Sequence, residues 1–253
     1  MRPAATGPGL LAGQVVVVTA AAGAGIGAAT ARRCAEEGAR VVLSDRHEAG
    51  LAQAVVDLSG YGATGVACDV TDPRGMDDLL GEVEARLGAV DVLVNNAGLG
   101  GTATVSEMTD DEWHRVLDVS LGGTFRGTRA ALRAMCPRRR GTIVNVASVT
   151  GRRAEAGQAH YGAAKAGVMA LTRCAAVEGA PYGVRVNAVA PTLAMHPFLA
   201  RVADPEVLAG WISHQPQQRA ARPEEVADVI VWLASGASSY LTGEVISVGG
   251  QHP

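Results

Sequence analysis

Short runs of apolar, largely β-branched residues recur along the chain and alternate with longer segments of helical periodicity. Most of the runs are four to six residues long, which is typical of parallel strands that are buried on both faces of a sheet. We predict seven strands, at residues 14–19, 40–44, 65–68, 90–95, 142–146, 184–189 and 245–248.

Between these strands the pattern predicts amphipathic helices. Thr109 and Glu112 have the spacing of a capping box, and Pro223 suits the first turn of a helix. The predicted helices cover residues 27–38, 48–59, 73–87, 110–135, 160–179 and 224–234. Regular alternation of strand and helix indicates an α/β fold, a single-domain Rossmann-like doubly wound parallel sheet of about seven strands with helices on both faces.

One segment, residues 192–221, has no clear periodicity and follows the sixth predicted strand. Ligands of open α/β sheets bind beyond the carboxyl ends of the strands, so a long insertion there is predicted to be a substrate lid. The alternative is an ordinary surface excursion. We expect an N-terminal extension at residues 1–12 and one dinucleotide-binding catalytic domain at 13–253.

The overall charge gives no reason to expect a polyanionic partner. A formal net charge of −3 and a pI of about 6.1 do not attract nucleic acid or anionic membranes. There is neither a signal peptide nor an apolar stretch long enough to span a membrane, so we expect a cytoplasmic protein. The four cysteines are far apart, and neither a metal site nor a disulfide framework is predicted.

The first strand is followed by a glycine-rich turn that opens a helix. Residues 20–27 are Ala-Ala-Ala-Gly-Ala-Gly-Ile-Gly. Such a turn allows close backbone approach to a pyrophosphate, which the N–H groups at the helix N-terminus stabilise. The predicted contacts are Ala21, Gly23, Gly25, Ile26 and Gly27.

An acidic residue at the end of the second strand bears on the choice of cofactor. Asp45 lies 18 residues beyond Gly27, close to the spacing at which a carboxylate accepts hydrogen bonds from the adenosine ribose. Because that carboxylate repels a 2′-phosphate, we predict NAD(H), with NADP(H) as the alternative. Arg46 is next in the chain and favours the alternative, since a guanidinium could bind the phosphate.

The chain after the fifth strand contains three residues with the chemistry of a proton-transfer site, Ser148, Tyr161 and Lys165. The four-residue step from Tyr161 to Lys165 places both on one face of a helix, and a nearby ammonium favours the phenolate form of tyrosine. Lys165 is the only lysine among 22 Lys and Arg residues, which indicates a position where a guanidinium will not serve. Ser148 would hold the substrate oxygen close to Tyr161.

With these motifs the sequence resembles the single-domain short-chain dehydrogenase/reductase family, over residues 11–250. The resemblance implies a nicotinamide dinucleotide cofactor and a ketone or secondary-alcohol substrate. It also implies a homotetramer or homodimer built through the helices at 110–135 and 160–179. Further cofactor contacts implied by the family motifs are Asp69, Val70, Asn96, Ala97, Gly98, Pro191, Thr192 and Ala194, in addition to Tyr161 and Lys165.

The sequence departs from the family pattern at four positions. Ala20 stands where the glycine loop normally begins, and the loop is one residue longer than usual. Ser120 replaces the catalytic asparagine, so a proton-relay water would be held differently. Thr192 replaces a glycine, and His196 replaces the threonine that binds the carboxamide.

In these departures the sequence resembles an actinobacterial subgroup labelled 3-oxoacyl-carrier-protein reductase-like, which includes a steroid-catabolic hydroxyacyl-CoA dehydrogenase. The resemblance implies a bulky alicyclic or acyl-CoA-linked substrate bound by Ser148, Tyr161, His196, Phe198 and Leu199. One alternative is an NADPH-dependent 3-oxoacyl-carrier-protein reductase of fatty-acid or polyketide metabolism. Another is an inactive dinucleotide sensor, which the presence of Ser148, Tyr161 and Lys165 disfavours.

Overall fold

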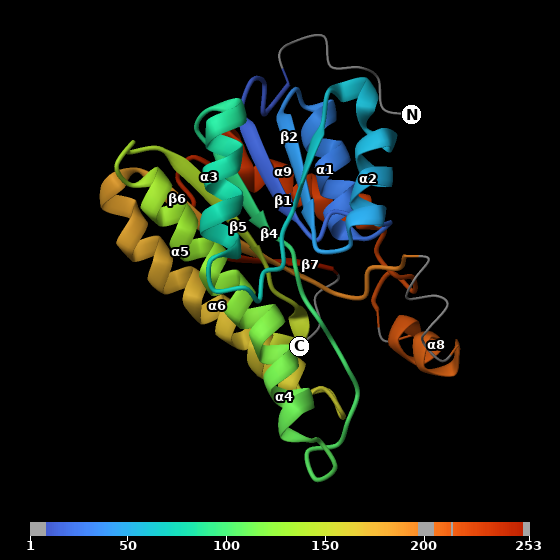
Figure 1. The fold of residues 1–253 in the computed structure, drawn as a ribbon. Helices are drawn as coiled ribbons and strands as arrows, with labels where there is room; N and C mark the ends of the chain where they lie inside the picture. The colour runs from blue at the N-terminus through green and yellow to red at the C-terminus, as the bar shows by residue number, and fades with distance from the viewer. Residues whose placement is uncertain (1–8, 197–204, 214, 250–253) are drawn as a thin grey trace.

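The computed structural model describes residues 9–196, 205–213 and 215–249, and shows a central sheet covered by helices (Figure 1). All seven predicted strands form, and each pairs in parallel with its neighbours in the order β3-β2-β1-β4-β5-β6-β7. The predicted doubly wound sheet is therefore confirmed. The strands are β1 Val15–Thr19, β2 Arg40–Asp45, β3 Thr64–Ala67, β4 Val92–Asn95, β5 Gly141–Val146, β6 Val184–Pro191 and β7 Val245–Val248.

The helices form two layers, one on each face of the sheet (Figure 1). Helices α1, α2 and α9 pack on one face, and α3, α5 and α6 pack on the other. Their bounds are α1 Ile26–Glu36, α2 Glu48–Asp57, α3 Gly75–Leu87, α4 Asp110–Leu117, α5 Gly123–Met135, α6 Ala159–Gly179, α8 Pro205–Ser213 and α9 Pro223–Ala234.

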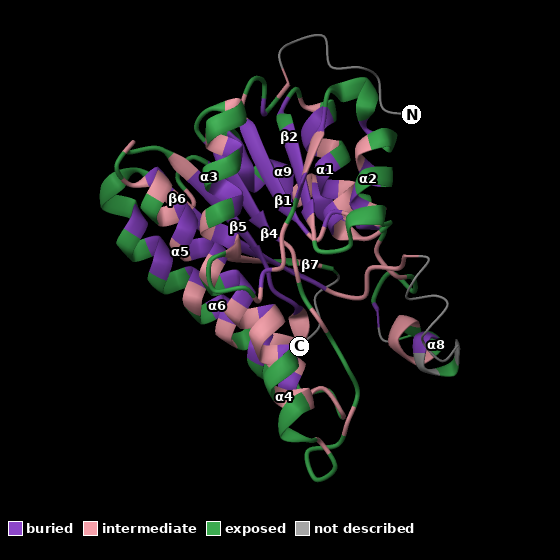
Figure 2. Cartoon of the chain, viewed as in Figure 1, coloured by how far each residue is buried: buried purple, intermediate pink, exposed green. Residues whose placement is uncertain are grey.

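Alternating side chains of β1 show why the strands are apolar throughout. Val16 and Val18 belong to the core under α1 and α9, whereas Val15 and Val17 belong to the core under α3, α5 and α6. Successive side chains of a strand point to opposite faces. Both faces are covered, so the sheet is buried along most of its length (Figure 2).

The helix predicted at 110–135 is interrupted. A π-helical turn, η2 at Asp118–Gly122, joins α4 to α5. Single π turns inside helices occur often at functional sites, and Ser120 lies at the centre of this one. The predicted capping box of Thr109 and Glu112 is present, with the Glu112 N–H donating to the threonine hydroxyl at 3.2 Å.

The segment at 192–221 leaves the sheet and returns to nearly the same place. Ala194 forms an isolated parallel bridge with Ala221, and the N–H of Met195 donates to the Ala221 carbonyl oxygen at 2.9 Å. Within the segment α8 forms, which the sequence pattern did not predict. Phe198 and Leu199 lie outside the described residues.

Strand order determines where a ligand can bind. β1 and β4 are neighbours although they are not consecutive in the chain, and ligands of open α/β sheets bind at such a switch point, beyond the carboxyl ends of the strands. The glycine-rich turn, the loops that follow β4 and β5, and the segment after β6 all begin at that edge. None of the helices in the described ranges is long and apolar enough to cross a membrane.

Candidate functional site

The glycine-rich turn has the geometry that a pyrophosphate requires. Gly23 has a φ of +110°, and a Cβ added to Gly23 or Gly25 would have no neighbour within 4 Å among the described residues. No side chain caps the N-terminus of α1 at Gly25, and its first turn carries no acidic residue. The first N–H groups of α1 are therefore available to an anion in open space, so the residues present fit the dinucleotide.

Close packing fixes the far side of this turn. A Cβ on Gly27 would lie against the carbonyl oxygen of Ala20 and 2.5 Å from Nδ2 of Asn96. That amide nitrogen donates to the carbonyl oxygens of Thr19 at 3.0 Å and Ala20 at 3.1 Å. Asn96, predicted as a cofactor contact, thus holds the backbone of the turn in place.

Thr19 is a residue that the sequence analysis missed. It is buried at the end of β1, and its hydroxyl accepts the N–H groups of Asn96 at 2.9 Å and Ala97 at 3.1 Å. The available signal was a hydroxyl that ends an otherwise apolar strand. Thr19 thus joins the end of β1 to the loop after β4 by two hydrogen bonds.

Asp45 lies at the end of β2 and faces the glycine turn. Its carboxylate accepts the Ala22 N–H at 3.1 Å and the His47 N–H at 3.0 Å, one on each oxygen. A carboxylate has about four acceptor positions, so capacity remains for ribose hydroxyls. The exposed Arg46 lies 3.9 Å from Asp69, and a backbone hydrogen bond from Thr71 holds the pKa of Asp69 below its usual range.

The structure brings Ser148 and Tyr161 together. Burial raises the pKa of Tyr161 above its ordinary value, while the neighbouring Ser148 side chain acts on it in the opposite direction. The Ser148 hydroxyl also accepts the Thr150 N–H at 3.2 Å. Ser148 is therefore held at the start of the turn that follows β5, beside the tyrosine hydroxyl.

Lys165 is buried one turn further along α6. Its ammonium donates to the carbonyl oxygen of Val146 at 2.7 Å, and burial lowers its pKa to about 8. A Cβ added to Gly98 would lie 3.2 Å from Nζ. The loop after β4 thus packs against the ammonium, and a larger residue at Gly98 would crowd it.

The predicted catalytic residue Ser120 is fully buried. Its hydroxyl donates to the carbonyl oxygen of Leu99 at 3.0 Å and accepts the N–H of Leu99 at 2.9 Å. The π turn aims this hydroxyl at the loop after β4, close to Gly98 and Lys165. The serine side chain is thereby committed to the protein backbone.

A second missed group is the segment at the start of α6. Nδ1 of the buried His160 accepts the Tyr161 N–H at 2.9 Å, and a Cβ on Gly101 would lie 2.9 Å from Nε2 of His160. The Gln158 side chain donates to the Gly101 carbonyl oxygen at 2.9 Å. No sequence motif marks these residues, because their role depends on the path of a distant loop.

The residues after β6 continue the same edge. Pro191 pairs with Val248 in the sheet, and the N–H of Thr192 donates to the Val248 carbonyl oxygen at 3.1 Å. Ala194 lies at the base of the 192–221 segment. His196 is half-buried, and burial lowers its pKa.

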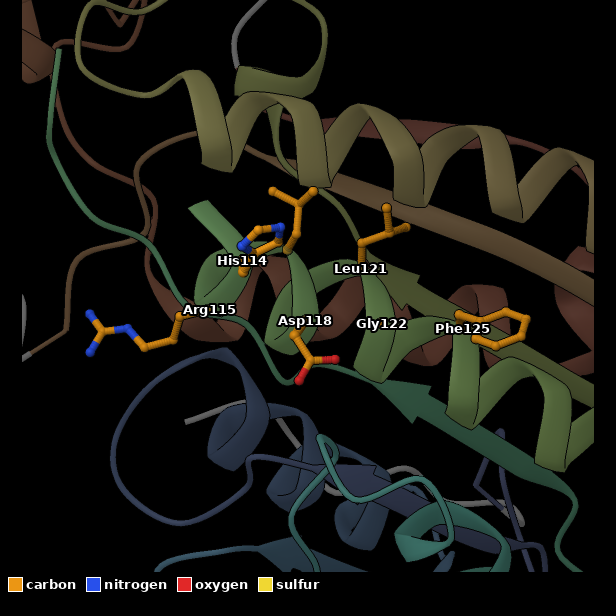
Figure 3. A pocket seen from close by; sticks show the side chains of 7 residues that line it. His114, Arg115, Asp118, Leu121, Gly122 and Phe125 are labelled. Carbon is orange, nitrogen blue, oxygen red and sulfur yellow. The ribbon is translucent and has the colours of Figure 1, made fainter. Parts of the chain in front are cut away.

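A surface pocket lies elsewhere, along α4, η2 and α5. Figure 3 shows Leu121 and Asp118 pointing to opposite sides of this segment. No predicted catalytic residue is part of its wall. The lining residues are His114, Arg115, Leu117, Asp118, Leu121, Gly122 and Phe125.

Comparison with known proteins places this geometry among oxidoreductases. Residues 20–251 match the family model described as enoyl-(acyl carrier protein) reductase. A short chain dehydrogenase of Mycobacterium smegmatis has a similar structure, with a TM-score of 0.86 and 49% identity, covering 100% of this chain and 98% of that one.

Three relatives are similar over nearly their whole length. The (5R,7aS)-5-hydroxy-7a-methyl-1-oxo-2,3,5,6,7,7a-hexahydro-1H-indene-carboxyl-CoA reductase of Mycobacterium tuberculosis is 58% identical, over 98% of this chain and 96% of its own. The cis-4-hydroxycyclohexanecarboxylate dehydrogenase of Sinomonas cyclohexanicum is 45% identical, over 94% and 95%. The 3-oxoacyl-[acyl-carrier-protein] reductase FabG of Escherichia coli is 37% identical, over 94% and 96%. The chain therefore belongs to the short-chain dehydrogenase/reductase family, whose enzymes oxidise CH–OH groups or reduce the corresponding carbonyls with a nicotinamide dinucleotide.

Proposed function

We propose that this enzyme interconverts a ring ketone and a secondary alcohol on a bulky alicyclic substrate, free or linked to coenzyme A, with NAD(H). The observation that carries the proposal is the 58% identity to a reductase named for an indene-carboxyl-CoA substrate. A second relative is named for a cyclohexanecarboxylate. Both names describe an alicyclic ring that bears a hydroxyl and a carboxyl group.

Tyr161 is proposed as the proton donor and acceptor. Its raised pKa keeps the hydroxyl protonated at neutral pH, ready to donate to the carbonyl oxygen as a ketone is reduced. Ser148, whose side chain lies beside Tyr161, would hold that oxygen with a second donor. The bound nicotinamide supplies or accepts the hydride.

Lys165 and Ser120 are proposed to support that proton transfer in different ways. The Lys165 ammonium, with its lowered pKa, lies near the tyrosine ring and favours the phenolate that remains after donation. Ser120 holds Leu99, and with it Gly98, against the lysine. We therefore assign Ser120 as a positioning residue, because its hydroxyl is engaged with Leu99.

Asp45 supports NAD(H) over NADP(H). Its carboxylate is anchored by two N–H groups and would have to approach a 2′-phosphate as a like charge. Along the same edge we propose Ala21, Gly23, Gly25, Ile26 and Gly27 for the pyrophosphate, and residues 192–221 as a lid over the substrate. The resemblance to the actinobacterial subgroup leads us to propose that the substrate side of that lid is lined by His196, Phe198 and Leu199.

A second candidate is 3-oxoacyl-carrier-protein reduction. The Escherichia coli relative of that name is 37% identical, and Arg46 could serve an NADPH-dependent enzyme. The lower identity and the anchored Asp45 favour the first candidate. An inactive sensor is disfavoured because the Ser148, Tyr161 and Lys165 side chains are all present and close together.

We also propose that copies of the chain associate through the pocket on α4, η2 and α5. Its wall contains Leu117, Leu121 and Phe125, and Phe125 is 46% exposed. An exposed aromatic residue beside aliphatic side chains is typical of an interface core. The implied dimer or tetramer would cover this surface.

The test is a turnover assay with fused-ring ketones, cyclohexanones and acetoacetyl thioesters, each with NADH and with NADPH. We expect NADH-dependent reduction that favours the bulkier rings, because apolar burial contributes about 1.5–3 kcal/mol per large side chain. A clear preference for short acyl thioesters with NADPH would support the second candidate. Absence of turnover with every ketone would support the sensor.

A further inference from the structure

Arg153 differs from every comparable arginine in the described part of the chain. Six described arginines are half-buried, and five of them donate a side-chain hydrogen bond to a protein acceptor, namely Arg33, Arg126, Arg129, Arg138 and Arg185. No hydrogen bond or ion pair joins the Arg153 guanidinium to any described residue. None of its side-chain nitrogens is among the fully buried unpaired atoms of the described residues, so its five donors are open to solvent and to a ligand.

The position of Arg153 relates it to the reacting groups. It lies five residues after Ser148 and eight before Tyr161. Its N–H donates to the carbonyl oxygen of Val149 at 3.2 Å, in the tight turn that Ser148 begins. That turn packs against α6, because a Cβ on Gly151 would lie 2.8 Å from the carbonyl carbon of Lys165.

The neighbouring arginine has the structural role instead. The Arg152 guanidinium donates to the Ser247 hydroxyl and to the carbonyl oxygen of Val245, both at 2.6 Å. These bonds fix the turn to β7. The hydrogen bonds of Arg152 therefore fix the backbone beside Arg153, and the Arg153 side chain makes none of them.

The same turn leads into the segment that touches α8. The carboxylate of Glu155 accepts the indole N–H of Trp211 at 3.3 Å. Glu155 is the acidic group nearest to Arg153 in sequence, and this bond directs it toward α8. Arg153 thus lies in the chain between Ser148 and Glu155, the residue that contacts α8.

We propose that Arg153 binds the anionic end of the substrate. A planar guanidinium can hold a carboxylate or a phosphate with two parallel hydrogen bonds. The inference rests on the proposed function, since an alicyclic acid or its coenzyme A thioester brings such an anion to the site. The anion is either a ring carboxylate or a phosphate of coenzyme A, and the two sources require separate measurements.

The experiment compares Arg153→Gln with the wild-type enzyme on matched ketones. One pair is 4-oxocyclohexanecarboxylate and its methyl ester; the other is a 4-oxocyclohexanecarboxyl thioester of coenzyme A and the same thioester of pantetheine. In at least one pair, Arg153→Gln should raise KM for the more anionic member about tenfold more than it raises KM for the other member. This ratio corresponds to the loss of one charge-assisted contact. Which pair responds identifies the anion.

Arg173→Gln is the matched control, because Arg173 is an exposed arginine on α6. It removes the same charge and should leave both ratios unchanged. The inference is overturned if Arg153→Gln changes both members of each pair equally, or if Arg173→Gln reproduces its effect. Failure of the proposed function is distinct, since the wild-type enzyme would then reduce none of the four ketones.

Discussion

The ammonium nitrogen of Lys165 lies 5.6 Å from the centre of the Tyr161 ring, one helical turn along α6. Burial acts on the two groups in opposite directions, lowering the pKa of the lysine and raising that of the tyrosine. Each charged form is costly alone in this environment, and each becomes less costly when the other is charged. The pair is therefore suited to move one proton to and from a substrate oxygen.

The buried lysine should reduce stability in a pH-dependent way. Burial lowers its pKa from 10.5 to about 8 in the folded state, so the unfolded chain binds the proton more tightly between these values. Below pH 8 the buried lysine therefore lowers the free energy of unfolding by about 3 kcal/mol. This penalty shrinks as the pH rises from 8 and is absent above pH 10.5, where the lysine is neutral in both states. Urea unfolding of wild-type and Lys165→Met proteins without cofactor, at pH 7 and pH 10, measures this penalty.

We expect Lys165→Met to be the more stable protein at pH 7, relative to wild type, and to lose most of this advantage at pH 10. Its turnover should be severely impaired at both values. A stability difference that does not change with pH would show that the lysine titrates normally in the folded protein.

Asp45→Ala should weaken the preference for NADH. In the wild-type enzyme the carboxylate should disfavour NADPH by on the order of 2 kcal/mol, roughly a 30-fold ratio in kcat/KM. The variant should reduce that ratio, because it removes the like charge and leaves Arg46 as the nearest charged side chain in the sequence. A wild-type preference for NADPH would contradict the cofactor assignment.

Ser120→Ala should reduce both stability and turnover. Removing the hydroxyl leaves the N–H and carbonyl of Leu99 without their buried partner, which costs about 1–3 kcal/mol of unfolding free energy. The loop that packs on Lys165 would loosen, so kcat should fall more than KM rises, and Ser120→Asn should restore part of it. The exposed Ser106→Ala, in the same loop, is the control. Unchanged kcat in Ser120→Ala would leave the residue without a positioning role.

Phe125→Glu should dissociate the proposed oligomer. A carboxylate placed in this contact would lose part of its hydration when the copies associate. Light scattering coupled to size exclusion should show a smaller mass with unchanged circular dichroism. Tyr61→Glu is the control, because Tyr61 is 47% exposed, against 46% for Phe125, and lies outside the pocket. Equal masses for wild type and Phe125→Glu would rule out this interface.

The elements that could be predicted are those governed by local pattern. β1 is apolar throughout because both of its faces are covered, and the strand–turn–helix around Gly23 to Gly27 is a local arrangement. The four-residue spacing of Tyr161 and Lys165 likewise determines their common face on α6.

What could not be predicted depends on contacts between distant segments. The π turn at Ser120 is recognisable only when Leu99 is known to lie opposite. The role of His160 depends on Gly101, and the lack of a partner for Arg153 depends on where every nearby acceptor lies. α8 was missed because its apolar pattern is short and lies in a segment without clear periodicity, whose two ends are joined by the Ala194–Ala221 bridge.

The central claim is that Tyr161 transfers the proton during hydride transfer, and Tyr161→Phe tests it most directly. Pre-steady-state reduction of a cyclic ketone should be measured under conditions where the chemical step limits the rate. NADH binding should be measured alongside, with Tyr240→Phe as the fully exposed control. We predict a rate loss of ~10²–10⁴ with nearly unchanged NADH affinity, because the phenyl ring cannot donate a proton. Retention of more than about a tenth of the wild-type rate would contradict the assignment.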